Sequence, residues 1–314
     1  MLLAQVAAWL LVGVVVVGLV SRNLTVANQP IIIAATFAPY TVVPAAFAVG
    51  LFLVAGASVG ALISTALIVA VILVELWPFV TGAPGHQGPV LTVMTSNLYL
   101  GKGDPASVLK QARARGVDVI ALQEITAESV AALRALGIDE DYPYRVLAPA
   151  PMWAGAALWS RLPLRDERSE LVGQLYRVSA VVGLDAARTD EDPTIISLHI
   201  HAPWPPPPGD WVTQLAELDT QIQTSARPLV AMGDYNATLN HAPFRRLLRN
   251  GVTDAAATSR TWWAFTYPAF RLVPPLITID HVVSRGMRGT NVRSVRIPGS
   301  DHLAVIVRLA RITG

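Results

Sequence analysis

The sequence contains no cysteine, and this absence removes several kinds of chemistry. None of its 314 residues can form a disulfide, act as a thiolate nucleophile, or bind zinc or an iron–sulfur cluster through sulfur. The net charge is also small, because 24 basic and 22 acidic residues leave a formal net charge of +2. Such a balance gives no support for strong electrostatic capture of nucleic acid.

Charged side chains are almost missing from residues 1–86, where only Arg22 and Glu75 carry one. Residues 87–314 have the composition of an ordinary soluble domain, and they are numerous enough to bury a full core. The chain therefore divides into an apolar first part and a globular second part.

Three apolar runs in the first part predict three membrane-spanning helices, at 1–20, 31–55 and 58–77. Each run reaches the ~20 residues needed to cross the ~30 Å hydrocarbon core of a bilayer. A cleavable signal peptide would need a basic start and polar chain after the first run, and neither is present. We therefore expect residues 1–77 to form a multi-pass anchor whose partner is the lipid bilayer.

The segment 78–89 is rich in proline and glycine and is expected to be a linker. After it, apolar β-rich runs alternate with helical patterns. Strands are expected at 90–96, 117–122, 155–160, 178–184, 194–200, 228–232, 278–284 and 303–309, and helices at 104–116, 126–137, 210–225 and 242–249. Most of the strand runs are continuously apolar, which is typical of a sheet covered on both faces. The pattern predicts a layered α/β domain over 90–314.

Polar side chains of a few types follow or end several of these expected strands. They are Asn97, Glu124, His199, His201, Asp234, Asn236, Asp280, Asp301 and His302. Residues at the same end of several strands converge on one edge of a sheet, where α/β enzymes commonly have their sites. We therefore treat this set as the candidate site.

The chemical types in this set suit the hydrolysis of a phosphate ester. Glu124, Asn97 and Asp301 offer oxygen ligands, which favour Mg²⁺ or Mn²⁺ over zinc. A cation there would draw charge off a phosphate group. A carboxylate such as Asp234 can deprotonate the attacking water. A carboxylate such as Asp280 can hold a histidine ring and keep it protonated.

The ordered motifs of the second part resemble the endonuclease/exonuclease/phosphatase superfamily, whose members include deoxyribonuclease-I-like nucleases. These motifs are TSNL at 95–98, DVIALQE at 118–124, WSRLPL at 159–164, GDYN at 233–236, TIDHVVS at 278–284 and SDH at 300–302. The resemblance covers about 90–310, and it rests on the whole ordered set because no single motif is specific. It implies a four-layer α/β sandwich that uses a divalent metal.

The resemblance also implies roles for individual residues. Asn97 and Glu124 resemble the family's metal-site pair, with Asp301 completing the site. Asp234 and Asn236 resemble the pair that positions the water and the phosphate.

For the histidines, the resemblance implies that His302 is catalytic and that Asp280 orients it. The family has one further strand histidine that contacts the scissile phosphate, and both His199 and His201 are candidates. The proline that follows at short range makes His201 the better match.

Two signals for membrane topology disagree. Arg22 follows the first span and mildly favours a cytoplasmic loop there, which would place the catalytic domain inside. The stretch ATFAPY at 35–40 resembles a bacterial membrane-anchored subgroup, which implies a cell-membrane protein with an extracytoplasmic catalytic domain. We expect the second arrangement.

The expected function is metal-dependent hydrolysis of phosphodiester or phosphate-ester bonds by in-line attack of water. Nucleic acid and phospholipid headgroups are both open as substrates, and no obligate protein partner is inferred. The alternative is a membrane-bound module of the same fold that binds a phosphate ligand without catalysis. Hydrolysis is favoured because every acid, amide and imidazole position that it needs is filled.

Overall fold

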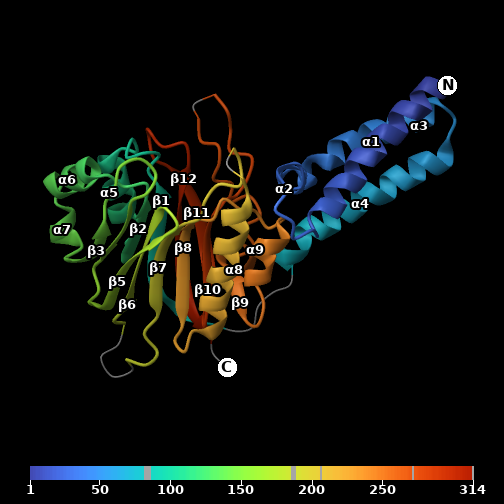
Figure 1. The fold of residues 1–314 in the computed structure, drawn as a ribbon. Helices are drawn as coiled ribbons and strands as arrows, with labels where there is room; N and C mark the ends of the chain where they lie inside the picture. Colours follow the sequence, from blue (N-terminus) through green and yellow to red (C-terminus); the bar gives the residue numbers. More distant parts are fainter. Residues whose placement is uncertain (81–85, 185–188, 206, 271, 313–314) are drawn as a thin grey trace.

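A computed structural model describes residues 1–80, 86–184, 189–205, 207–270 and 272–312. A bundle of apolar helices projects from one side of an α/β domain (Figure 1). The bundle and its connections comprise α1 (Leu2–Ser21), α2 (Gln29–Thr36), the 3₁₀ helix η1 (Ala38–Thr41), α3 (Val42–Val54) and α4 (Ser58–Val80).

Two helices, α1 and α4, are each long and apolar enough to cross a membrane. The expected second span is not one continuous helix, because the chain bends by 65° between α2 and the segment that starts at Ala38. Pro39 lies at this bend, where its ring and its missing N–H oppose helix continuation. The expected three spans therefore become two, or three if the bent pair counts as one span.

Helices α1, α3 and α4 pack closely, with α3 contacting both of the others. A Cβ at Gly18 would lie 2.9 Å from Cγ2 of Thr41, and one at Gly60 would lie 2.5 Å from the ring of Phe52. Small residues thus permit the close approach typical of membrane helices. Large apolar side chains such as Leu3 and Leu62 remain exposed on the outside, as expected for a surface covered by lipid.

The α/β domain contains two six-stranded sheets packed face to face. The first has the order β11 (Met287–Arg296), β12 (Leu303–Ile312), β1 (His86–Asn97), β2 (Val119–Gln123), β4 (Ala156–Ser160) and β3 (Tyr144–Ala148). The second has the order β5 (Leu164–Val172), β6 (Leu175–Val182), β7 (Thr194–His199), β8 (Leu229–Asp234), β10 (Asp280–Arg285) and β9 (Val252–Asp254).

Helices cover the outer face of each sheet, which gives the four layers expected from the sequence (Figure 1). On the first sheet lie α5 (Pro105–Ala114), α6 (Ala127–Ala135) and α7 (Ile138–Asp141), and on the second lie α8 (Gly209–Thr224) and α9 (Ala242–Leu247). Alternate side chains of β1 enter different cores, with Val93 between the sheets and Met94 under the helices. The short α10 (Ala255–Thr258) follows β9. The predicted four-layer α/β sandwich is confirmed.

The strands that the sequence pattern missed are mostly peripheral. β3, β9 and β11 are at or near sheet ends, and β5 is an edge strand with the mostly exposed sequence LRDERSELV. Edge strands need no apolar run, so their patterns are weak. The expected linker over 78–89 overlaps the end of α4 at Val80 and the start of β1 at His86, and residues 81–85 lie outside the described residues.

Candidate active site

Strand pairing brings the candidate residues to one edge of both sheets. β7 and β8 are parallel, and His199 pairs with Asp234 at their ends. β10 runs antiparallel to β8, so that its first residue, Asp280, also lies opposite Asp234. In the first sheet, the parallel strands β1 and β2 end with Asn97 opposite Gln123, immediately before Glu124. The predicted convergence at a common edge is therefore present.

Asn97 links the two sheets at this edge. Its Nδ2 donates to Oε1 of Glu124 at 3.0 Å and to Oδ2 of Asp234 at 3.1 Å. The second oxygen of Glu124 accepts from the backbone N–H of Leu100 at 2.6 Å. Glu124 and Leu100 both have φ of +56°, in the left-handed region that costs energy for side-chain-bearing residues. Such strained conformations concentrate at functional sites.

His302 is held by a buried carboxylate. Its Nδ1 lies 2.8 Å from Oδ2 of Asp280, while Nε2 faces Oδ2 of Asp234 at 3.7 Å. Burial alone lowers the pKa of His302, but the negative charges of Asp280 and Asp234 outweigh it and raise this pKa above its usual value. The imidazole is therefore suited to remain protonated at neutral pH.

Asp234 occupies the centre of the site and is 1% exposed. Burial raises its pKa, although the neighbouring His302 opposes this shift. Its Oδ1 accepts from the backbone N–H of Asn236 at 2.8 Å, which fixes the carboxylate orientation. A carboxylate with a raised pKa is a stronger proton acceptor than an exposed one.

Of the two strand histidines, the structure brings His199 into the site and leaves His201 outside it. Nε2 of His199 lies 3.5 Å from Oδ2 of Asp234 and 3.4 Å from Nδ2 of Asn236. His201 instead bonds through its backbone N–H to Gln214 of α8, and its buried Nε2 has no hydrogen-bond partner among the described residues. Burial lowers its pKa.

The expected preference for His201 stays a prediction, while the contacts with Asp234 and Asn236 favour His199. β7 ends at His199, and the N–H of Ile200 then bonds to the backbone oxygen of Asp234 at 2.9 Å. Because the chain leaves the strand after His199, the alternation of side chains along a strand no longer predicts where His201 lies. The proline that follows His201 does not indicate where the strand ends.

Glu124 and Asp301 form the part of the site that fits a divalent cation. Asp301 Oδ1 is buried and has no hydrogen-bond partner among the described residues. Burial raises the pKa of Asp301, His302 opposes this, and the negative charge of Glu124 adds to it. These two carboxylates are hard oxygen donors that match Mg²⁺ or Mn²⁺, whereas Oδ1 of Asn97 accepts from the backbone N–H of Tyr99 at 2.9 Å.

A second group, Asp234, Asp280 and His302, also has ligand atoms within 4.8 Å of one another. Asp280 is already bonded to Nδ1 of His302, and the raised pKa of that ring favours a cation there. Because a protonated imidazole repels a metal, this group fits proton transfer better than metal binding.

Three supporting residues have no role in the sequence-based prediction. Oγ1 of Thr266 accepts from the backbone N–H groups of Ile279 and Asp280, at 3.1 and 3.2 Å. The Tyr267 ring packs 4.9 Å from that of His302. Ser300 donates to the backbone oxygen of Asn97 at 2.7 Å. Only Ser300 is next to site residues in the sequence, whereas Thr266 and Tyr267 precede Asp280 by 14 and 13 residues.

The chain belongs to the endonuclease/exonuclease/phosphatase family, because the model of that family matches residues 94–302, more than half of the chain. This places the fold of the α/β domain in one known class of proteins. No curated protein sequence is similar enough to this chain to count as a match.

Solved structures show the same fold at low sequence identity. A humanized D. rerio TDP2 is 13% identical with a TM-score of 0.58, covering 71% of this chain and 99% of its own. An endonuclease/exonuclease/phosphatase protein from Bacteroides vulgatus is 15% identical with a TM-score of 0.56, covering 71% and 99%. The human Nocturnin catalytic domain with bound sulfate is 15% identical with a TM-score of 0.53, covering 73% and 97%. These structures leave 27–29% of this chain uncovered, which is about the share of the chain that forms the helical bundle.

Proposed function

We propose that this chain is a membrane-anchored, Mg²⁺-dependent hydrolase that cleaves phosphodiester or phosphate-ester bonds. The observation that carries the proposal is the position of Asp234. It is bonded on one side to the Asn97–Glu124 pair and faces the His302–Asp280 pair on the other. Family membership supports the reaction class. TDP2 of D. rerio has been solved with a single-stranded DNA product, which fits a phosphodiester substrate for the fold.

Asp234 is the group that orients the attacking water and accepts its proton. Its raised pKa makes this transfer more favourable near neutral pH than for an exposed aspartate. Asn97 and Asn236 fix the two carboxylate oxygens by hydrogen bonds. Because the carboxylate of Asp234 is held in one orientation, it directs the water at the phosphorus.

His302, kept protonated by Asp280, donates to a phosphoryl oxygen as negative charge develops. His199 and Asn236 lie beside Asp234, where they are positioned to bind the same phosphate group. A divalent cation held by Glu124, Asn97 and Asp301 supplies Lewis-acid stabilisation of the charge on phosphate oxygen. Mn²⁺ suits the same ligands.

For location, we propose a multi-pass protein of the cell membrane with the catalytic domain outside the cytoplasm. The apolar helices α1 and α4 support the membrane part. The likeness of residues 35–40 to a membrane-anchored subgroup supports the outside position, against the single opposing charge of Arg22. Protease protection of the domain in intact cells tests the orientation.

The test uses the full chain in detergent with Mg²⁺, Mn²⁺ or a chelator. The substrates are bis(p-nitrophenyl) phosphate, single-stranded DNA and phospholipid vesicles. We expect metal-dependent hydrolysis that Glu124→Gln and Asp234→Asn abolish and the exposed control Glu128→Gln retains. A folded chain that binds metal but cleaves nothing would favour the non-catalytic phosphate-binding module instead.

A further inference from the structure

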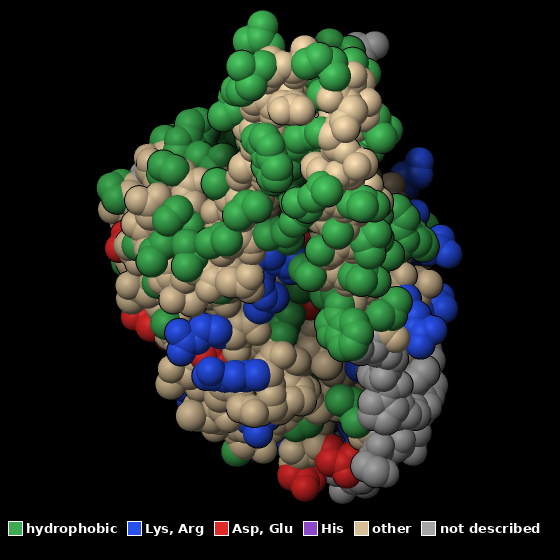
Figure 2. Space-filling view, turned by 90° about the vertical axis from the view of Figure 1, so that its right-hand side faces the viewer, with side chains coloured by type: hydrophobic (Ala, Val, Ile, Leu, Met, Phe, Trp, Pro, Cys, Tyr) green, Lys and Arg blue, Asp and Glu red, His purple; other side chains and the backbone are tan. Residues whose placement is uncertain are grey.

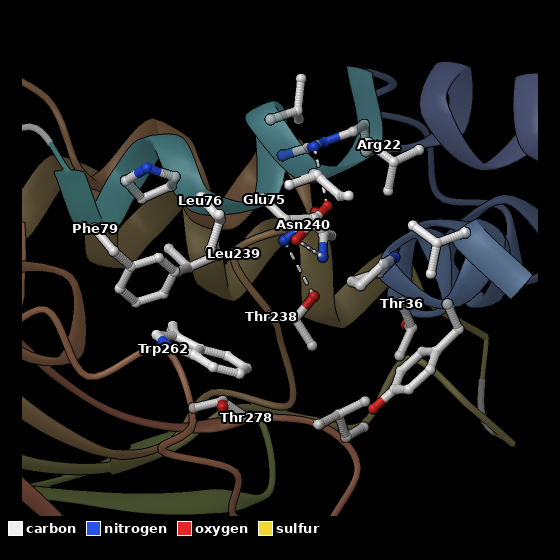
Figure 3. A pocket seen from close by; sticks show the side chains of 18 of the residues that line it. Arg22, Thr36, Glu75, Leu76, Phe79, Thr238, Leu239, Asn240, Trp262 and Thr278 are labelled. Carbon is white, nitrogen blue, oxygen red and sulfur yellow. Dashed lines mark hydrogen bonds and ion pairs between the residues drawn. The ribbon is translucent and has the colours of Figure 1, made fainter. Parts of the chain in front are cut away.

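A cavity of about 400 Å³ lies where the helical bundle meets the α/β domain. Figure 3 shows Leu76 and Phe79 of α4 on one side of it, and Leu239, Trp262 and Thr278 of the domain on the other. Tyr40 of η1 lies at a further wall. Most of the lining is apolar, so the cavity suits a hydrocarbon ligand.

The polar end of the cavity carries one charge of each sign. Arg22 and Glu75 form an ion pair at 3.1 Å, and Nδ2 of Asn240 donates to the same carboxylate at 3.1 Å (Figure 3). The charges cancel locally. Oδ1 of Asn240 is buried and has no hydrogen-bond partner among the described residues. It offers one acceptor to a hydroxyl or amide of a ligand.

The cavity adjoins the end of the apolar helix α4. Its bundle side is formed by the last turns of α4, next to Trp77, which is 66% exposed and of a type common at bilayer interfaces. The adjoining domain loop presents a series of exposed apolar side chains: Trp262, Trp263, Phe270, Leu272, Val273 and Leu276. Figure 2 shows hydrophobic side chains spread over the bundle, with Lys and Arg on the domain around it. A patch of this kind marks contact with a membrane.

The same cavity is close to the catalytic carboxylates along the chain. Thr278 in its wall precedes Asp280 by two residues, and Thr238 follows Asp234 by four. Two residues span at most ~7 Å and four at most ~14 Å between Cα atoms. Thr278 and Thr238 of the cavity wall therefore lie within these distances of Asp280 and Asp234, so the wall of the cavity adjoins the site.

We propose that this cavity binds the hydrocarbon chain of a membrane phospholipid and that the phosphate headgroup of this lipid is the substrate. The proposal rests on the proposed hydrolase function and selects its substrate class. The lining itself offers no net positive charge to a nucleic-acid backbone, because its cationic side chain, Arg22, is neutralised by Glu75. A lipid reaches the cavity by lateral diffusion along the helices that form its wall.

The binding half of the proposal is tested by photolabelling without catalysis. The full chain is placed in nanodiscs of phosphatidylglycerol, phosphatidylethanolamine and phosphatidylinositol, with a diazirine in the acyl chain and a chelator present. We expect adducts on Leu239, Trp262 and 276–278 of the domain, besides those on α1, α3 and α4. Adducts confined to the helices would overturn the proposal.

A pair of variants on one helix isolates the cavity. Leu76→Trp fills the cavity from the bundle side, whereas Leu73→Trp places the same side chain at a position of α4 that is 62% exposed and outside the lining. We expect Leu76→Trp to reduce domain labelling and headgroup release about tenfold, equivalent to ~1.4 kcal/mol. Both variants should hydrolyse soluble bis(p-nitrophenyl) phosphate like the wild type.

The outcomes separate the two proposals. Hydrolysis of the soluble diester without domain labelling or headgroup release overturns the lipid substrate and leaves the hydrolase intact. Domain labelling without hydrolysis of any substrate overturns the hydrolase, and with it the substrate half of this proposal. Equal headgroup release by Leu76→Trp and Leu73→Trp would show that the cavity does not serve the reaction.

Discussion

Nδ1 of His302 lies 2.8 Å from Oδ2 of Asp280, and this contact orients the other ring nitrogen toward Asp234. The two residues come from neighbouring sheets, since Asp280 opens β10 and His302 immediately precedes β12. The pair therefore depends on the sandwich being assembled. Its geometry fixes the orientation of the imidazole ring and favours the protonated form.

Removing the charge of Asp280 should impair catalysis without removing the histidine. In Asp280→Asn, the lost carboxylate lowers the pKa of His302 and loosens its ring, so kcat should fall by roughly 10²–10⁴ with little change in KM. Steady-state hydrolysis of bis(p-nitrophenyl) phosphate measures both constants. An unchanged kcat would mean that the pair is structural only.

The two strand histidines should differ sharply in their effect on activity. His199 adjoins Asp234 and Asn236, whereas the backbone N–H of His201 bonds to Gln214 of α8 and its buried Nε2 has no hydrogen-bond partner among the described residues. We expect His199→Ala to lower kcat by about 10²–10³, as for loss of one donor to a developing oxyanion. His201→Ala should keep most of the activity, although it costs stability. Equal losses, measured on proteins of matched thermal stability, would restore His201 as a candidate.

The positions of strands could be predicted from the sequence where every residue of the strand is buried. β2 and β8 are buried throughout, so their apolar runs located the strands and the acids that follow them. Prediction failed where structure depends on distant partners. The exposed strand β5 has no strong local pattern, whereas the bend has a local signal in Pro39 that the apolar run around it outweighed in the prediction.

The docking of the bundle on the domain was equally hidden from sequence analysis. Ile32 of α2 belongs to the core formed by β7, β8, α8 and α9. Arg245 of α9 bonds to the backbone oxygen of Arg22. Contacts between residues more than 160 positions apart produce no periodic pattern in the sequence. They also make the full chain, rather than the isolated domain, the proper subject of experiments.

Metal affinity should depend on Glu124. Glu124→Gln removes one anionic oxygen from the hard-ligand set formed with Asp301 and Asn97, so Mn²⁺ binding should weaken by about 10–100-fold or more. Electron paramagnetic resonance of free Mn²⁺ measures this directly. Glu128→Gln, which alters an exposed carboxylate nearby, serves as the matched control. Wild-type affinity in Glu124→Gln would place the metal elsewhere.

A second buried pair, His281 and Asp254, should make stability depend on alkaline pH. The two ring nitrogens lie 2.9 Å from Oδ2 of Asp254 and 2.9 Å from the backbone oxygen of Ala237, so both carry protons. Burial alone lowers the pKa of His281, but Asp254 raises it above 6.5 overall. The folded state thus holds a proton that the unfolded state releases. The resulting stabilisation is complete below about pH 6.5 and is lost as pH rises through the folded pKa.

Asp254→Asn tests this pair while leaving an N-cap acceptor for Ala257 of α10. We expect the variant to be less stable than the wild type by about 3 kcal/mol at pH 6, with a smaller difference at pH 9. Thermal unfolding in detergent at both values gives the comparison. A difference that is independent of pH would show that His281 is neutral in the folded protein.

His241 should produce the opposite pH dependence at the contact between α2 and the domain. Its Nδ1 accepts from the backbone N–H of Thr238 at 2.9 Å, and Nε2 lies 3.1 Å from the backbone oxygen of Ile32 and 3.0 Å from Oγ1 of Thr36. This pattern fits a neutral ring. Burial lowers the pKa of His241 to about 4. Between this value and the ordinary 6.5, the undocked state binds a proton that the docked state does not.

Docking of α2 should therefore weaken as pH falls from 6.5 toward 4, by an amount on the order of 3 kcal/mol at the acid end. The chain lacks cysteine, so Ile33→Cys and Arg246→Cys at two exposed positions give a clean pair of spin-label sites. We expect their distance distribution to be narrow at pH 7.5 and broad near pH 4. His241→Gln cannot titrate but keeps a side-chain donor, so it should remove this dependence. Broadening in both proteins would assign the acid sensitivity to another group.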